Sequence, residues 1–173
     1  MGYCLLYEGM LDTVLYARDH FLVKGGLIFP ERARIYVAAI NDFEYKMASD
    51  SFYDPATNPY GGISLKTFMQ KKSSFVCVDR IDPKLLITNE CKIFDVDINT
   101  CKVDDLQFSS EYHLKVNPQP GKARNWRHDI SGIVMWFEVD FPIADNMTED
   151  KRIVLSTSPR DKWTHWKHQL LYF

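Results

Sequence analysis

The chain has 173 residues, of which 46% are hydrophobic and 14% aromatic. This much apolar material fits one ordinary globular domain and excludes a disordered segment. The 21 basic and 23 acidic residues give a formal net charge of −2, so the overall charge gives no argument for direct nucleic-acid binding.

The cysteines and the first residues bear on location. No CxxC pair occurs, and the wide cysteine spacing is typical of reduced thiols rather than a disulfide scaffold. We therefore expect a cytoplasmic or nuclear protein. Met1-Gly2 opens like a myristoylation signal, but Leu6 stands where Ser or Thr is needed. Charged residues interrupt every apolar stretch, so no membrane span is predicted. The N-terminus lacks the basic region of a signal peptide, so no signal peptide is predicted either.

Residues 1–24 are predicted to form one amphipathic helix. Apolar side chains recur at helical spacing at Leu6, Met10, Val14, Ala17 and Phe21. The pair Gly25-Gly26 offers the left-handed conformation that commonly ends a helix.

The periodicity changes after these glycines. Residues 34–40 alternate in the manner of a strand. Further strand-like runs lie at 75–78, 85–98, 101–108, 112–116, 133–141, 153–156 and 166–173. The expected fold class is mainly β, an N-terminal helix followed by an antiparallel β-barrel or sandwich.

Two stretches lack a strand pattern. Residues 49–72 combine prolines and glycines with a short apolar group, Leu65, Phe68 and Met69. A loop of this length with its own apolar residues is typically functional or contacts another chain. Residues 117–129 form a second, polar loop, to which no role is assigned.

Glu8 is the first candidate for chemistry. It lies among apolar residues with Tyr3 and Tyr7 nearby, and a carboxylate in such surroundings can bind a guanidinium group bidentately. The alternative interpretation is an acidic residue in the first turns of the predicted helix.

A second candidate group is Trp163-Thr164-His165-Trp166. It is interpreted either as a packed sheet edge or as a loop that covers a pocket. His165 and His168 do not predict a metal pair, because residues three apart in a strand point to opposite faces. No phosphate-binding glycine loop or nucleophile elbow occurs.

Several segments resemble protein arginine methyltransferases. The opening Met1-Gly2-Tyr3-Cys4-Leu5-Leu6-Tyr7-Glu8-Gly9-Met10 resembles the second half of that family's double-glutamate loop. Residues 24–30, KGGLIFP, are similar to the family's crossing from helix into barrel, and residues 82–89, DPKLLITN, match a stretch between. STSP at 156–159 and THWK at 164–167 resemble its threonine-histidine-tryptophan loop, and all of these segments keep family order.

The resemblance implies a division of the chain. Residues 1–24 would end a cofactor domain and residues 25–173 would form the β-barrel substrate domain, with 49–72 as an inserted helical dimerisation arm. Glu8 would be catalytic, as the second glutamate that holds the substrate arginine. The expected substrate-binding residues are Met1, Tyr3, Met10, His165 and Trp166.

The resemblance also implies a cofactor and partners. S-adenosylmethionine would bind in an N-terminal domain outside these residues, and no cofactor-binding residue or metal ligand is expected within them. The substrates would be arginine-containing proteins, with histones and Gly/Arg-rich RNA-binding proteins as candidates, converted to mono- and asymmetric dimethylarginine by a homodimer. We expect a C-terminal part truncated at both ends and inactive alone.

A second interpretation comes from a different class of protein. The chain could form a non-catalytic β-sandwich interaction module that uses tryptophans as a stacking platform. The candidates for such a platform are Trp126, Trp136, Trp163 and Trp166.

Overall fold

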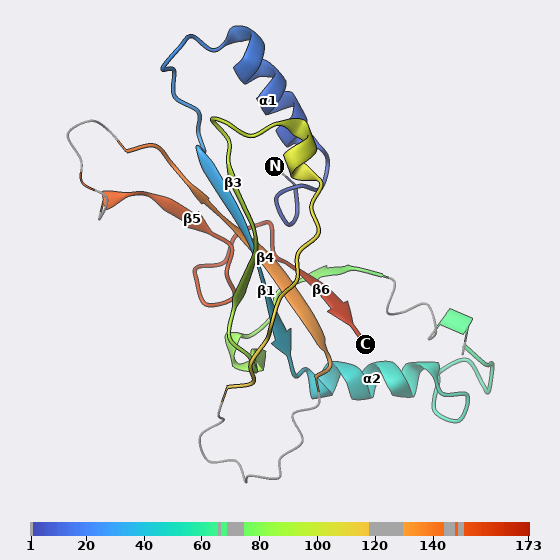
Figure 1. Ribbon diagram of the computed structural model, residues 1–173. Helices are drawn as coiled ribbons and strands as arrows, with labels where there is room; N and C mark the ends of the chain where they lie inside the picture. The colour runs from blue at the N-terminus through green and yellow to red at the C-terminus, as the bar shows by residue number, and fades with distance from the viewer. Residues whose placement is uncertain (1, 66, 69–74, 118–129, 144–147, 149–150) are drawn as a thin grey trace.

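The computed structural model describes residues 2–65, 67–68, 75–117, 130–143, 148 and 151–173 (Figure 1). Its centre is a twisted antiparallel sheet with the order β2-β6-β4-β1-β3, and β5 also pairs with β4. The strands are β1 (Arg32–Ile40), β2 (Cys77–Asp79), β3 (Cys91–Asp97), β4 (Gly132–Asp140), β5 (Val154–Ser156) and β6 (His168–Tyr172). The mainly antiparallel β class is confirmed. The strand pairs of the described residues leave the sheet open rather than closed into a barrel.

The strands β1 and β4 form the spine of the sheet and pair along nine residues each. Both faces of this spine are buried. Ala33 and Ile35 face a hydrophobic cluster that also contains Leu11 and Leu15 of the helix α1 (Met10–Phe21). Alternate side chains further along β1 enter a second cluster on the opposite face with Trp136.

One edge of β4 is shared by two short strands. β6 pairs with Gly132–Met135, and β5 pairs with Glu138–Asp140. The segment 157–167, which connects β5 to β6, leaves the sheet between these two pairings. We call this segment the tryptophan loop.

The predicted N-terminal helix is wrong in its extent. The helix α1 covers only Met10–Phe21, and residues 2–9 form turns, here called the N-terminal loop. Cys4, Leu5 and Glu8 have φ values of 49°, 68° and 78°, which a right-handed helix excludes. The helix ends when Leu22 becomes extended, before Gly25, which is left-handed but does not cap it.

Other predicted strands are also corrected. Residues 101–108 hold a 3₁₀ helix, η2 (Val103–Leu106), because the Asp105 carboxylate accepts from the Lys102 amide at 2.8 Å and turns the chain. A second 3₁₀ helix, η1 (Pro83–Leu85), precedes β3, so the run 85–98 is a strand only from Cys91. In the run 112–116, only Val116 makes an isolated bridge, to Thr88.

The helix α2 (Phe43–Tyr53) was not predicted as a separate element. Its N-cap is Asp42, whose side chain accepts from the Tyr45 amide at 3.1 Å. None of its residues is buried, and it projects from one end of the sheet (Figure 1). The predicted arm therefore continues a helix that begins at Phe43. Met69 and residues 118–129 lie outside the described residues.

The helices α1 and α2 have 12 and 11 residues. Across the described ranges, no helix combines the length and hydropathy that a membrane crossing needs.

Candidate functional site

The N-terminal loop folds tightly on itself. The Leu5 amide donates to the Gly2 carbonyl at 3.1 Å, and the Tyr7 amide donates to the Tyr3 carbonyl at 3.3 Å. A Cβ atom at Gly2 would lie 2.1 Å from the Tyr7 carbonyl oxygen, so only glycine permits this approach. The buried Leu5 side chain, 1% exposed, anchors the loop in the core.

This loop corrects the alternative interpretation of Glu8 as a residue of the first helical turns. Glu8 lies on the loop and precedes the first helical residue, Met10, so it is no acid of the helical turns. Its side chain is exposed, as is that of Met10, whereas Tyr3 is half-buried with its ring 6.3 Å from that of Tyr7. Met1 lies outside the described residues.

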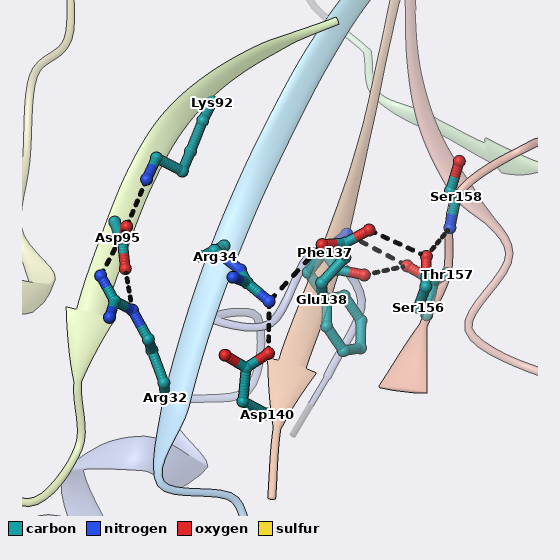
Figure 2. Close-up of polar contacts among 10 residues, drawn as sticks. All are labelled: Arg32, Arg34, Lys92, Asp95, Phe137, Glu138, Asp140, Ser156, Thr157 and Ser158. Atoms are coloured by element: carbon teal, nitrogen blue, oxygen red, sulfur yellow. Dashed lines mark hydrogen bonds and ion pairs between the residues drawn. The ribbon is translucent and has the colours of Figure 1, made fainter. Parts of the chain in front are cut away.

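The tryptophan loop is fastened to β4 by hydroxyl groups. The Thr157 hydroxyl accepts from the Phe137 amide at 3.0 Å and donates to the Phe137 carbonyl at 2.9 Å. Next to it, the Ser156 hydroxyl donates to Glu138 at 3.2 Å (Figure 2). These contacts fill the gap between the two strands that share the edge of β4, and they fix where the loop begins.

The two loops meet at one hydrophobic cluster. Trp166 is half-buried and packs edge-on against Phe137, with 5.6 Å between ring centroids. Trp166 packs against the same cluster that contains Leu5, the anchor of the N-terminal loop. His165 lies at the surface with its ring 4.0 Å from that of Trp166. The N-terminal loop, through Leu5, and the tryptophan loop, through Trp166, are therefore anchored in the same core cluster.

Ion pairs support the sheet beneath this patch. Arg34 on β1 pairs with the buried Asp140 carboxylate and lies 3.7 Å from Glu138, both on β4. Arg32 binds Asp95 on β3 through two contacts of 2.7 and 3.0 Å (Figure 2). Glu138 thus connects the strand pairs to Ser156 at the start of the tryptophan loop. The long-range pairing of Arg34 had no signal in the sequence.

His168 is buried, whereas His165 is exposed. It is 4% exposed, and its Nδ1 accepts from the Ile81 amide at 3.2 Å. Burial lowers the pKa of His168, against the smaller effect of hydrogen bonds with the backbone of Thr157 and Asp79. In the part of the chain that is described, no three metal-ligating side chains come together.

The buried His168 predicts a pH effect on stability. Because its pKa falls below the ordinary 6.5 on folding, the unfolded chain binds the proton first, and the free energy of unfolding decreases as the pH drops below 6.5. Urea unfolding at pH 7.5 and 5.5 measures this decrease. In His168→Gln the difference between the two pH values should be smaller, and an unchanged difference would contradict the assignment.

The three tryptophans among the described residues do not form a shared platform. Trp136 is 1% exposed and Trp166 packs into the core, whereas Trp163 is 64% exposed. Trp126 lies outside the described residues. The Arg80 guanidinium covers the Trp163 ring at 4.5 Å from its centroid, a contact that sequence reasoning missed.

Comparisons with known proteins agree on one family. Residues 31–173 match the family model described as the arginine methyltransferase oligomerization subdomain. Protein arginine N-methyltransferase 1 of Dictyostelium discoideum is 39% identical over all of this chain and 46% of its own length. Its counterpart in Saccharomyces cerevisiae is 36% identical, over 45% of its own length.

The chain belongs to the protein arginine methyltransferase family. It spans about half the length of the curated relatives it matches. Among solved structures, the Trypanosoma brucei PRMT1 enzyme-prozyme heterotetrameric complex with AdoHcy matches with a TM-score of 0.84 and 30% identity. The match covers all of the present chain and 50% of the chain in that structure. Arabidopsis thaliana protein arginine methyltransferase 10 has a TM-score of 0.71 and 26% identity, over 53% of its chain.

Proposed function

We propose that these residues form the substrate side of an S-adenosylmethionine-dependent protein arginine methyltransferase. The observation that carries the proposal is the convergence of the N-terminal loop and the tryptophan loop on one core cluster in a chain of this family. Arginine methylation needs a carboxylate and a flat apolar surface at one place. Glu8 on one loop and Trp166 on the other supply these groups.

Glu8 is the proposed catalytic residue. A guanidinium is a poor nucleophile because its charge is delocalised, and a carboxylate draws that charge to one side and orients the group. Trp166 offers a flat face on which the guanidinium packs. Tyr3, Met10 and His165 are proposed to contact the substrate around it, with Met1, which is not among the described residues.

The cofactor is proposed to bind outside this chain. S-adenosylmethionine supplies the methyl group, and none of the present residues is assigned to it, because no glycine-rich loop occurs among them. The division into a helix of a cofactor domain and a substrate domain from residue 25 is part of the same proposal. We place the complete protein in the cytoplasm, the nucleus or both.

The substrates are proposed to be arginine-containing proteins, with histones and Gly/Arg-rich RNA-binding proteins as candidates, and the products mono- and asymmetric dimethylarginine. The test uses the full-length protein, radiolabelled cofactor and a Gly/Arg-rich peptide, with mass spectrometry of the product. We expect methylation that is abolished when lysine replaces arginine in the peptide. No transfer to any arginine-containing protein would contradict the proposal.

Self-association through the arm is the remaining part. The family model names an oligomerization subdomain, and the helix α2 together with the rest of the arm exposes large apolar side chains. These are Phe43, Met47, Phe52, Tyr60, Ile63 and Phe68. We propose a second copy of the chain as the partner.

Residues 1–173 alone should not bind S-adenosylmethionine at micromolar concentration. The reason is that the cofactor is proposed to bind outside this chain, and no residue among 1–173 is assigned to it. Isothermal titration calorimetry measures the binding, and circular dichroism of the same sample shows whether the polypeptide is folded. Micromolar binding by a folded sample would place the cofactor site inside these residues.

A further inference from the structure

A small pocket lies beside the tryptophan loop, where the loop passes the pair of strands β2 and β6. Its volume is about 10 Å³, which is room for one water-sized group. The residues around it are Arg80, Thr157, Ser158, Lys162, Trp163, Thr164, Lys167 and His168. We call it the cationic pocket.

The lining of this pocket is positive. It contains three basic side chains, Arg80, Lys162 and Lys167, and no carboxylate. Lys167 lies 3.8 Å from the exposed Asp79, which weakens its field only in part. Among the described residues, Arg80 and Lys162 form no ion pair with a carboxylate. The pocket therefore keeps a net attraction for an anion.

Two of its groups are held in place. The stacking of Arg80 on Trp163 fixes the guanidinium at the rim. His168 adds no charge of its own at neutral pH, because it is buried and its Nδ1 already accepts from Ile81. Thr164 also lines the pocket, and a threonine hydroxyl can donate to an oxyanion.

We propose that the cationic pocket binds an oxyanion of the protein substrate, a carboxylate or phosphate group near the arginine to be methylated. The location supports this source, because Thr164 lines the pocket and is bonded to His165, the exposed residue of the candidate site. The pocket admits an oxygen atom but no larger group, so the rest of the anion stays at its mouth. This inference rests on the proposed function.

The first experiment measures binding and does not depend on catalysis. Labelled Gly-rich peptides carry lysine in place of arginine and either phosphoserine, Asp or Asn at one to four positions from it, and fluorescence anisotropy reports their affinity for the full-length protein. We expect the anionic peptides to bind about three- to tenfold more tightly than the Asn peptide. The Arg80→Gln/Lys162→Gln double variant should lose this preference, and the matched control Lys115→Gln, an exposed cation outside the pocket, should keep it.

Competition separates the sources of the anion. Inorganic phosphate at millimolar concentration should reduce the preference for the anionic peptides. At micromolar concentration it should leave that preference unchanged. Equal binding of all peptides, combined with tight binding of phosphate alone, would overturn the proposal in favour of a free anion. Loss of single-stranded RNA binding in the double variant, with no peptide preference, would overturn it in favour of a nucleic acid.

The second experiment measures methylation of the corresponding arginine peptides. The ratio of kcat/KM between acidic and neutral peptides should exceed one in the wild type and in Lys115→Gln, and should approach one in the double variant. Methylation with no such ratio would sink this inference and leave the proposed function intact. Peptide preference without methylation of any peptide would show an anion-binding pocket but contradict the proposed function, and with it the assignment of the anion to a methylation substrate.

Discussion

Replacing Glu8 with Gln in the full-length protein is expected to lower methylation turnover by roughly ten- to a hundred-fold, the loss of one charge-assisted hydrogen bond of about 1.5–3 kcal/mol. The amide keeps the size of the side chain but no longer draws the guanidinium charge toward one side. Glu8 is exposed on the N-terminal loop, so the change removes no packing. Steady-state kinetics with a Gly/Arg-rich peptide measure the effect.

Two controls make the result specific to Glu8. The affinity for S-adenosylmethionine should stay unchanged, because the carboxylate faces the substrate arginine in the proposed arrangement. Glu111→Gln removes the same charge from another exposed position and should leave turnover near the wild-type value. If Glu8→Gln retained full activity, the assignment of the carboxylate to the guanidinium would be wrong.

The central strands were predictable because their patterns are local. Alternating apolar residues at 34–40 and 133–141 correspond to β1 and β4, whose side chains fill the two clusters on opposite faces. The sequence could not show that β5 and β6 share one edge of β4. That arrangement depends on Thr157 and its contacts with Phe137, which join residues 20 positions apart.

The elements at the surface were harder to predict because tertiary contacts override their periodicity. The apolar spacing from Leu6 to Phe21 is helical, yet left-handed residues keep the first part as a loop. Residues 101–108 turn away from a strand where Arg18 donates to the carbonyls of Ile98 and Cys101, each at 2.7 Å. No local pattern encodes a contact between residues 80 positions apart.

The candidate site shows the same division. The family resemblance selected Glu8, His165 and Trp166 from opposite ends of the chain, whereas the structure shows that Leu5 of the N-terminal loop and Trp166 of the tryptophan loop share one core cluster. The Arg80–Trp163 stack had no sequence signal, because an exposed arginine and an exposed tryptophan are each common alone. Motifs can therefore name candidate site residues, whereas the residues that pack beside them are known only from the three-dimensional structure.

The exposed apolar side chains of α2 and of the arm predict the largest change in assembly. Met47→Glu/Phe68→Glu in the full-length protein should shift the proposed dimer toward monomer. Their side chains are 54% and 66% exposed, so burial in an interface would contribute up to about 1.5–3 kcal/mol each, and a buried carboxylate would oppose association further. Analytical ultracentrifugation over a range of concentrations measures the dimer dissociation constant, which should rise by at least about a hundred-fold.

The folded monomer should be unaffected, because neither side chain contributes to the core clusters. Val103→Glu provides a control, since it places a carboxylate on an exposed apolar residue, 47% exposed, outside α2 and the arm. The dimer dissociation constant of that variant should stay at the wild-type value. A dimer of unchanged affinity in the arm variant would show that association uses another surface, and the arm would then need a different partner to explain its apolar side chains.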